Sequence, residues 1–246
     1  MEQIFTQTVT VQPQDLNPAG NFKLSSLLYY VQEASGGHCR QLSCDWDTLA
    51  EKGMFWAVLR HRVVIHRLPQ PGQTVTVQTW PLPTTRVAYP RAVQALDEKG
   101  NVLFEAMSLW VLMDRQTRAM ILPSKSGIEV PGIVRGTEIE TPASLAPQAY
   151  EQHCLWEVAQ ADLDQNRHVN NTIYLDRAEQ LTGAFGSGRC PREFTVCYLA
   201  EARLGQMLTL SWAGSDEDIL FLEGTRPRAG ENEKAERVFA AKLIFD

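Results

Sequence analysis

The spacing of hydrophobic residues in the first half of the chain predicts one long helix within a series of strands. Apolar residues recur at helical intervals between Leu24 and Ala34, which predicts a helix from Lys23 to Leu42. Alternation of apolar and polar residues predicts a strand before it, at 4–11. After the long helix we expect a short helix at 45–52, closed by Gly53, and strands at 55–67, 74–80, 86–96 and 102–113.

The second half of the chain repeats this order of elements. A strand is predicted at 150–158, followed by a polar loop and by a helix that has Asn170 or Asn171 as its N-cap and stops at Gly183. Between the halves, residues 122–149 contain four of the 13 prolines and no sustained periodicity, which indicates a linker. Four further strands are predicted at 194–203, 206–213, 219–225 and 237–245.

Short sequence matches indicate that the two halves arose by tandem duplication. Three segments recur in the same order, with offsets that differ only as loop lengths allow: Asp15–Asn17 with Asp162–Asp164, Gly72–Val77 with Gly205–Leu210, and Phe104–Ala106 with Phe239–Ala241. We therefore predict an α+β protein with an N-terminal domain at 1–121, the linker at 122–149 and a C-terminal domain at 150–246.

Composition narrows the kinds of partner that we expect. The net charge of -6 argues against nucleic acid, because phosphate binding requires a basic face. The five cysteines form no Cys-x-x-Cys pair, so we predict no disulfide framework, no metal site and no other cofactor. The N-terminal residues do not resemble a signal peptide and no apolar run reaches membrane-spanning length, so we expect a cytoplasmic protein without a membrane partner.

The segment from Asp162 to His168 concentrates polar groups of chemical interest. Asp162, Asp164, Asn166 and His168 stand at every second position, which in an extended segment places their side chains on one side. The segment leads into the positive end of the predicted helix, which attracts an oxygen that gains negative charge. In a second interpretation, these residues only cap the helix and satisfy each other's hydrogen bonds.

The duplication favours the functional interpretation of this segment. In the first copy, Asn21 stands at the position of His168, so only the second copy carries the imidazole. A loop needed for folding alone could keep the same residues in both copies, whereas a site needed once can decay in one of them. The side chains of Asn166 and His168 suit hydrogen bonding to a carbonyl and proton transfer near neutrality, which indicates hydrolysis of an activated acyl group.

Two other residues have competing interpretations. Glu201 lies among mainly apolar neighbours in a predicted strand, where it either faces solvent from an edge or joins the site. Cys197, on the same strand, is more typical of a small core residue than of a nucleophile. The sequence contains no Gly-x-Ser-x-Gly motif, phosphate-binding loop or dinucleotide fingerprint, so serine-hydrolase and nucleotide chemistry lack their main sequence support.

The segment Asp162–Asn171, with Tyr174 after it, resembles the signature of the acyl-acyl-carrier-protein thioesterases, which include the plant FatA and FatB enzymes. The resemblance implies a tandem double hot-dog fold, in which each copy is a long helix wrapped by an antiparallel sheet and the C-terminal copy is catalytic. It also implies that Asp164, Asn166 and His168 occupy catalytic positions. Tyr198–Ala202 falls on the family's Tyr-Arg-x-Glu-Cys segment, which adds Glu201 to the site.

This sequence departs from the family pattern in that segment. Ala202 replaces the family cysteine and Leu199 replaces its arginine, so the resemblance excludes a covalent cysteine mechanism at that position and predicts direct attack by water. We expect Asn166 and helix amides to hold the thioester oxygen, and Asp164 to orient Asn166 and His168. The choice of general base between His168 and Glu201 stays open.

The resemblance further implies that the N-terminal copy houses the acyl chain. Leu28, Gly36 and Gly37 on the long helix are candidates to line that site, with Asn170 and Tyr174 as further candidates for substrate binding. The glycine pair has a second interpretation, in which a neighbouring strand approaches the helix closely. Packing against a strand is the more typical of the two.

The partner that the resemblance implies is an acyl carrier protein that carries a fatty acyl chain. Because this carrier is acidic, we expect a local basic face on the enzyme. An acyl-CoA thioesterase, a hydratase of the same fold and a non-catalytic acyl-binding module are the alternatives, and the chain can be a monomer or a homodimer. Candidates for the basic face are Arg60, Arg62, Arg67, Arg115 and Arg118, which are otherwise ordinary solvated arginines.

Overall fold

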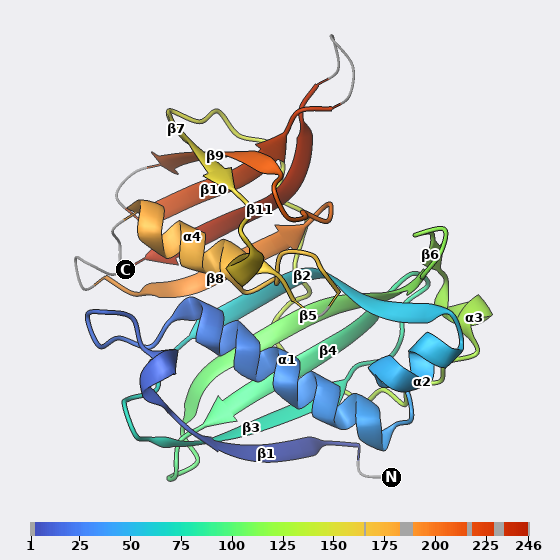
Figure 1. Ribbon diagram of the computed structural model, residues 1–246. Coiled ribbons are helices and arrows are strands. Elements are labelled where there is room, and N and C mark those ends of the chain that lie inside the picture. Colours follow the sequence, from blue (N-terminus) through green and yellow to red (C-terminus); the bar gives the residue numbers. More distant parts are fainter. Residues whose placement is uncertain (1–2, 165, 183–188, 216–217, 229–233, 246) are drawn as a thin grey trace. The chain divides into compact units, whose positions relative to one another are not determined.

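The chain forms two compact units in a computed structural model, Met1–Pro142 (unit 1) and Ala143–Asp246 (unit 2). The structure describes residues 3–164, 166–182, 189–215, 218–228 and 234–245. The predicted helix stop at Gly183 lies outside the described residues. Each unit contains an antiparallel sheet and one longer helix, as predicted for an α+β protein (Figure 1).

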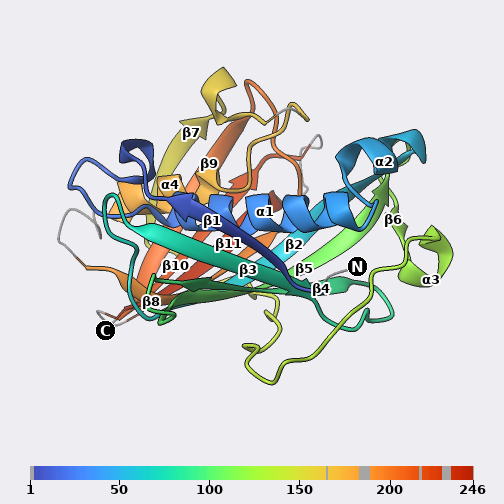
Figure 2. The same cartoon turned by 90° about the horizontal axis from the view of Figure 1, so that it is seen from below.

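Unit 1 contains six strands, of which five follow one another in the order β1-β3-β4-β5-β2, while the short β6 pairs with β5. All of these pairings are antiparallel. Figure 2 shows α1 lying across one face of this sheet. The elements are β1 (Phe5–Thr10), η1 (Pro13–Asp15), α1 (Leu24–Gln41), α2 (Trp46–Glu51), β2 (Met54–Ile65), β3 (Thr74–Pro81), β4 (Tyr89–Leu96), β5 (Val102–Asp114), β6 (Met120–Ile121) and α3 (Pro123–Ser126).

The apolar stripe that predicted α1 is the face that the helix buries. Leu24, Leu28 and Val31 are fully buried, and so are the other members of the stripe. Both ends of the helix lie within one residue of the predicted boundaries. The capped start of α2 is also local in origin, because the side chain of Asp45 accepts a hydrogen bond from the Thr48 N–H at 2.9 Å.

The two glycines of α1 have different surroundings. A Cβ atom at Gly37 would come within 2.4 Å of the ring of Phe5, which stacks on His38, whereas a Cβ at Gly36 would meet only the tip of Arg40 at 4.0 Å. Gly37 therefore allows β1 to approach the helix, as the packing interpretation predicted. Gly36 has no comparable packing role.

The proline-rich segment after β6 is more structured than its sequence predicted. It begins with α3 and continues as an irregular segment that packs along β3, where the Ile133 N–H donates to the Pro81 carbonyl at 2.9 Å. The Trp80 indole N–H donates to Glu138 at 3.1 Å, and the Arg135 guanidinium lies over the Trp80 ring. This part of the expected linker therefore covers the sheet of unit 1.

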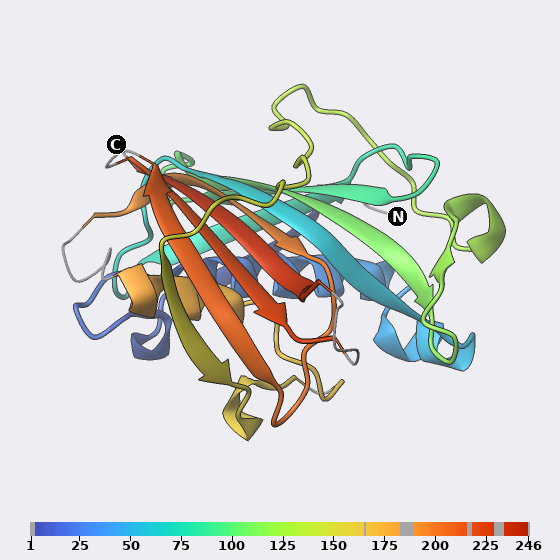
Figure 3. The same cartoon turned by 90° about the horizontal axis from the view of Figure 1, so that it is seen from above.

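Unit 2 repeats the strand order of unit 1. Its five strands follow one another as β7-β9-β10-β11-β8, all antiparallel, and Figure 3 shows them side by side. Each strand matches the one at the same place in unit 1, as the tandem duplication predicts. The elements are β7 (Gln152–Glu157), η2 (Gln160–Asp162), α4 (Ile173–Thr182), β8 (Pro191–Tyr198), β9 (Met207–Ser215), β10 (Ile219–Arg226) and β11 (Glu236–Phe245).

One turn has the same backbone hydrogen bonds in both copies, as the duplication predicts. In unit 1, Val11 N–H donates to Gln73 O and Gly72 N–H donates back to Val11 O. In unit 2, Val158, Gln206 and Gly205 form the same pair of bonds. Gly72 and Gly205 have φ angles of 73° and 74°, so a glycine is favoured at this turn in both copies.

Within the part of the chain that the structure describes, no helix combines the length and apolar content needed to cross a membrane.

Alanine substitutions at the two glycines of α1 should have different effects on stability. Both remove the helix cost of glycine, about 1 kcal/mol, but only Gly37→Ala forces a methyl group against Phe5. Gly37→Ala should therefore be less stable than Gly36→Ala by about 1–3 kcal/mol in denaturant unfolding. Equal stability of the two variants would contradict the close approach of Phe5.

Candidate active site

The polar segment before α4 forms a tight loop rather than an extended strand. Leu163 and Val169 pair as an isolated bridge, and Arg167 has a positive φ of 63°. The prediction that alternate side chains point to one side was therefore wrong for this segment. The backbone turns back on itself between Asp164 and His168, whose main chains are joined by an N–H···O bond of 2.8 Å.

The Asp162 side chain makes its contacts with residues outside the loop. Its carboxylate is buried and accepts hydrogen bonds from the Ala159 N–H at 2.8 Å and the Trp156 indole at 3.3 Å. It also forms an ion pair with Arg177 at 2.9 Å. Asp162 therefore stabilises the start of the loop and takes no part in the candidate site.

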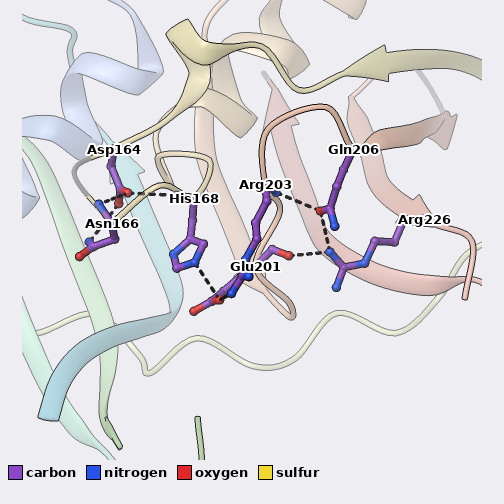
Figure 4. A network of polar contacts seen from close by, with 7 residues as sticks. All are labelled: Asp164, Asn166, His168, Glu201, Arg203, Gln206 and Arg226. Carbon is purple, nitrogen blue, oxygen red and sulfur yellow. Dashed lines mark hydrogen bonds and ion pairs between the residues drawn. The ribbon is translucent and has the colours of Figure 1, made fainter. Parts of the chain in front are cut away.

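Asp164 organises the loop through both of its carboxylate oxygens. Oδ1 accepts hydrogen bonds from the backbone N–H of Asn166 at 2.8 Å and of His168 at 3.4 Å. Oδ2 accepts one from the Asn166 side-chain amide at 3.3 Å (Figure 4). The carboxylate thus fixes the backbone of the loop and the orientation of the Asn166 carboxamide.

The first copy contains the same loop with different side chains. Asn17 Oδ1 accepts from the backbone N–H of Ala19 and of Asn21, both at 3.0 Å, as Asp164 does in unit 2. An N–H···O bond of 2.8 Å closes this loop as well, between Asn17 and Asn21. The loop geometry is therefore a folding feature of both copies, whereas Asn166 and His168 are peculiar to the second.

His168 and Glu201 lie together although they are distant in sequence. His168 Nε2 is 3.0 Å from Glu201 Oε2, and their side chains are 14% and 36% exposed. A backbone bond from the Val169 N–H to the Ala202 carbonyl, 2.8 Å long, joins the two loops. Glu201 follows β8, which ends at Tyr198, so its predicted place inside a strand was wrong.

Two arginines that the sequence did not single out also hold Glu201. Arg203 Nη2 lies 3.3 Å from Glu201 Oε2, and Arg226 Nη1 donates to the Glu201 carbonyl at 2.7 Å. Arg226 also binds Gln206 Oε1 at 2.8 Å and pairs with Glu236 at 2.7 Å (Figure 4 shows all but Glu236). The sequence contains one hint of these contacts, namely that Gln206 repeats Gln73 of the first copy. Each of these two side chains accepts a backbone N–H at 2.9 Å in its own unit.

Asn170 and Tyr174 have structural contacts in unit 2. Asn170 Oδ1 accepts from the Thr172 N–H at 3.1 Å in a turn that precedes α4. The helix begins at Ile173, shortly after the predicted N-cap positions. The ring of Tyr174 is buried, with its centroid 4.3 Å from that of Phe239. Burial raises the pKa of Tyr174 well above its usual range, so this phenol is not suited to proton transfer near neutrality.

The remaining candidates lie in the cores of their units. Leu28 is fully buried on α1, on the same helix as Gly36 and Gly37. Cys197 and Ala202 are fully buried in unit 2, and Cys197 Sγ lies 3.7 Å from the Ala143 carbonyl. Among the residues described, no three His, Cys, Asp or Glu side chains gather as a metal site would require.

The assembled groups suit acid–base chemistry on water. An imidazole in contact with a carboxylate can exchange a proton with a bound water, and a carboxamide held by Asp164 can donate to an oxygen. The arginines hold the Glu201 loop in place from the opposite side. These groups would serve hydrolysis of an ester or thioester.

Comparison with known proteins matches both halves of the chain to one family. Residues 2–123 match the acyl-ACP thioesterase N-terminal domain, and residues 146–239 match the acyl-ACP thioesterase C-terminal domain. A palmitoyl-acyl carrier protein thioesterase of Gossypium hirsutum is 26% identical over 190 residues, covering 70% of this chain and 45% of that protein. A dodecanoyl-[acyl-carrier-protein] hydrolase of Cinnamomum camphora is 26% identical over 253 residues, covering 90% and 64%. The chain thus spans about half to two thirds of the length of these relatives.

Solved structures share the fold. An acyl-ACP thioesterase from Bacteroides thetaiotaomicron superposes with a TM-score of 0.87 at 22% identity, covering 99% of this chain and 98% of that one. The 12:0-ACP thioesterase from Umbellularia californica gives 0.82 at 20% identity, covering 100% and 98%. These likenesses confirm the predicted tandem double hot-dog fold.

The first copy predicts how substitutions at Asp164 affect the loop. Asp164→Asn keeps an oxygen acceptor, as Asn17 does in unit 1, so its stability should stay within about 1 kcal/mol of the parent chain. Asp164→Ala leaves two backbone N–H groups without their acceptor and should lose about 1–2 kcal/mol. Thermal unfolding measures both effects, and equal losses would show that the acceptor oxygen does not organise the loop.

Proposed function

This chain belongs to the acyl-ACP thioesterase family, and we propose that it hydrolyses thioesters between a fatty acyl chain and acyl carrier protein. The products would be the free fatty acid and the carrier thiol. The observation that carries the proposal is the contact of His168 with Glu201, together with an Asn166 side chain that Asp164 orients in the same loop as His168. Unit 1 has the same loop without the imidazole, so we assign hydrolysis to unit 2 and binding of the acyl chain to unit 1.

In the proposed reaction, water attacks the thioester carbonyl carbon directly. Glu201 and His168 accept the proton of that water as the new C–O bond forms, with Glu201 fixed from behind by Arg226. When the tetrahedral intermediate collapses, the C–S bond breaks and the leaving thiolate takes up a proton from the same pair. Asn166 and amides at the start of α4 would stabilise the oxyanion, and one such donor is typically worth about 3–4 kcal/mol of barrier.

The residues around Glu201 support direct attack by water and not a mechanism in which a cysteine nucleophile forms a covalent intermediate. Ala202 carries no nucleophile, and Cys197 is fully buried within β8. Leu199, which is 45% exposed, cannot supply the charge of an arginine at that position. The nucleophile of the proposed reaction is therefore a water held by Glu201 and His168.

The five arginines that are candidates for binding the carrier protein differ in their contacts. Three of them already bind groups of unit 1: Arg60 the Pro142 carbonyl, Arg62 the Glu140 carboxylate and Arg67 the Asp97 carboxylate. Arg115 and Arg118 lie over the rings of Trp46 and Phe55 and are exposed. Because their side chains are exposed, these two are candidates to meet an acidic carrier.

Thiol release from matched acyl-ACP and acyl-CoA substrates tests the proposal. We expect faster release from acyl-ACP, and a loss of about 100-fold or more in kcat for Asn166→Ala, His168→Ala and Glu201→Ala. Because His168 and Glu201 act on one water, the double variant should lose little more than either single variant. Release from acyl-CoA alone would indicate the acyl-CoA thioesterase, and no release from either would indicate an acyl-binding module.

Arg226 should act as a positioning residue for Glu201. Arg226→Met removes the donor to the Glu201 carbonyl, so kcat should fall about 10-fold or more while KM changes little. Arg226→Lys should recover part of the loss, since an ammonium keeps the charge but cannot bridge Gln206 and Glu236 together.

A matched control for Arg226 is Arg60→Met. Arg60 also donates to a backbone carbonyl, that of Pro142 at 3.3 Å, but it lies in unit 1. If both methionine variants lowered kcat equally, the effect of Arg226 would be general destabilisation and not positioning of Glu201.

A further inference from the structure

Cys39 and Cys44 lie side by side at the end of α1, in a part of unit 1 that the proposed hydrolysis does not use. The helix ends with Ser43 in a left-handed conformation, at a φ of 53°. The Cys44 N–H donates to the Cys39 carbonyl at 3.0 Å, and the Ser43 N–H donates to Arg40 at 3.2 Å. This Schellman pattern brings the side chains at its two outer positions together, and here both are cysteines.

The backbone contact limits how far apart the two cysteines can be. With an N···O distance of 3.0 Å, standard covalent geometry allows a Cα···Cα separation of about 7 Å at most. Cys39 also packs against the hydrophobic cluster of unit 1 that contains Cys44. Because disulfides usually join Cα atoms about 4.4–6.8 Å apart, a bond between these sulfurs requires little movement of the backbone.

A buried arginine faces the pair from β4. Arg91 is 5% exposed and donates to His38 Nδ1 at 3.0 Å and to Thr79 Oγ1 at 3.3 Å. Its Nη2 lies 4.0 Å from Cys39 Sγ. No carboxylate of the described residues forms an ion pair with Arg91, and a buried cation without a counter-charge is costly. A thiolate at Cys39 would supply that charge.

The groups around the pair favour a thiolate on Cys39. The neighbouring Cys44 thiol and the guanidinium of Arg91 lower the pKa of Cys39, although burial and the Asp45 carboxylate oppose this. Arg40 acts in the same direction as Arg91. The neighbouring Cys39, together with burial, raises the pKa of Cys44. Cys39 is also the more exposed of the two, so a small oxidant would reach it first.

We propose that Cys39 and Cys44 form a peroxide-reactive dithiol, in which Cys39 is the sulfur that peroxide oxidises and Cys44 converts it to a disulfide. The Cys39 thiolate attacks one oxygen of hydrogen peroxide, so an S–O bond forms, the O–O bond breaks and the departing hydroxide takes up a proton. Cys44 then attacks the Cys39 sulfur, so the S–S bond forms and the S–O bond breaks. The hydroxide released from the Cys39 sulfur takes up the Cys44 proton and leaves as the second water molecule. The two thiols lose two electrons and the peroxide becomes two water molecules.

Peroxide treatment of the reduced, full-length chain tests this site, with intact mass and peptide mapping as readouts. We expect a loss of about 2 Da, a peptide that links Cys39 to Cys44, and complete reversal by a dithiol reductant. Cys39→Ser and Cys44→Ser should abolish the link. Cys154→Ser is the matched control, since it removes a partly exposed cysteine of unit 2 and should leave the link intact.

Two results would overturn the proposal. One is oxidation of Cys154 or Cys190 at peroxide concentrations that leave Cys39 reduced. The other is a gain of oxygen on Cys39 with no linked peptide, which would mean that Cys44 does not reach it. Both readouts follow thiols and not hydrolysis, so they are independent of the proposed enzymatic function.

The rate of Cys39 alkylation by iodoacetamide against pH tests the role of its neighbours. The parent chain should show an inflection below the ordinary thiol value of about 8.5, and Arg91→Met should move it upward towards that value. If circular dichroism shows that Arg91→Met is unfolded, Cys44→Ala makes a second test, because it removes the neighbouring thiol that lowers the pKa of Cys39 and leaves no donor in its place. A parent inflection in the ordinary range would contradict the thiolate on which the first step depends.

Discussion

Each half of this chain depends on one acceptor side chain that closes a tight loop ahead of its helix. In unit 1 the acceptor is Asn17 and in unit 2 it is Asp164, and each satisfies backbone N–H groups two and four residues later. The later residues contribute only their N–H groups to this arrangement. Their side chains can therefore change without loss of the loop, which explains how Ala19 and Asn21 in one copy correspond to Asn166 and His168 in the other.

The sequence predicted the elements of the fold well because their signals are local. Helical spacing identified α1 within one residue at each end, and alternation with turn residues located the strands of both units. The duplication followed from short repeats and is visible in the matching strand orders. The same local reasoning failed between Asp162 and His168. A two-residue period places side chains on one side only when the backbone is extended. Here the chain reverses at Arg167, which has a positive φ although arginine is not a residue type that predicts one.

The family resemblance placed Glu201 in the site with His168, but the contacts around Glu201 could not be predicted from the residues alone because they depend on distant parts of the chain. The N–H groups of Leu199 and Ala200 both donate to the Val238 carbonyl, an irregularity that ends β8 ahead of Glu201. Unit 1 has the same feature, since His66 and Arg67 both donate to Leu103. Arg226 reaches the Glu201 carbonyl from the end of β10, on another strand. A single sequence contains His168, Glu201 and Arg226 but not the distances between them.

Charge balance explains why two arginines in this chain have different roles. Arg226 pairs with Glu236, so its charge is already met and its remaining N–H groups can hold a neutral carbonyl and a carboxamide in fixed positions. Arg91 is more deeply buried, and its partners His38, Thr79 and Cys39 are neutral unless the thiol ionises. An arginine that is paired with a carboxylate, such as Arg226, therefore serves mainly to position its hydrogen-bond partners. An arginine without one, such as Arg91, instead shifts the pKa of its neighbours. A negative charge on Cys39 stabilises the buried guanidinium of Arg91. The stability of unit 1 and the reactivity of the Cys39 thiol therefore both depend on the ion pair between these two side chains.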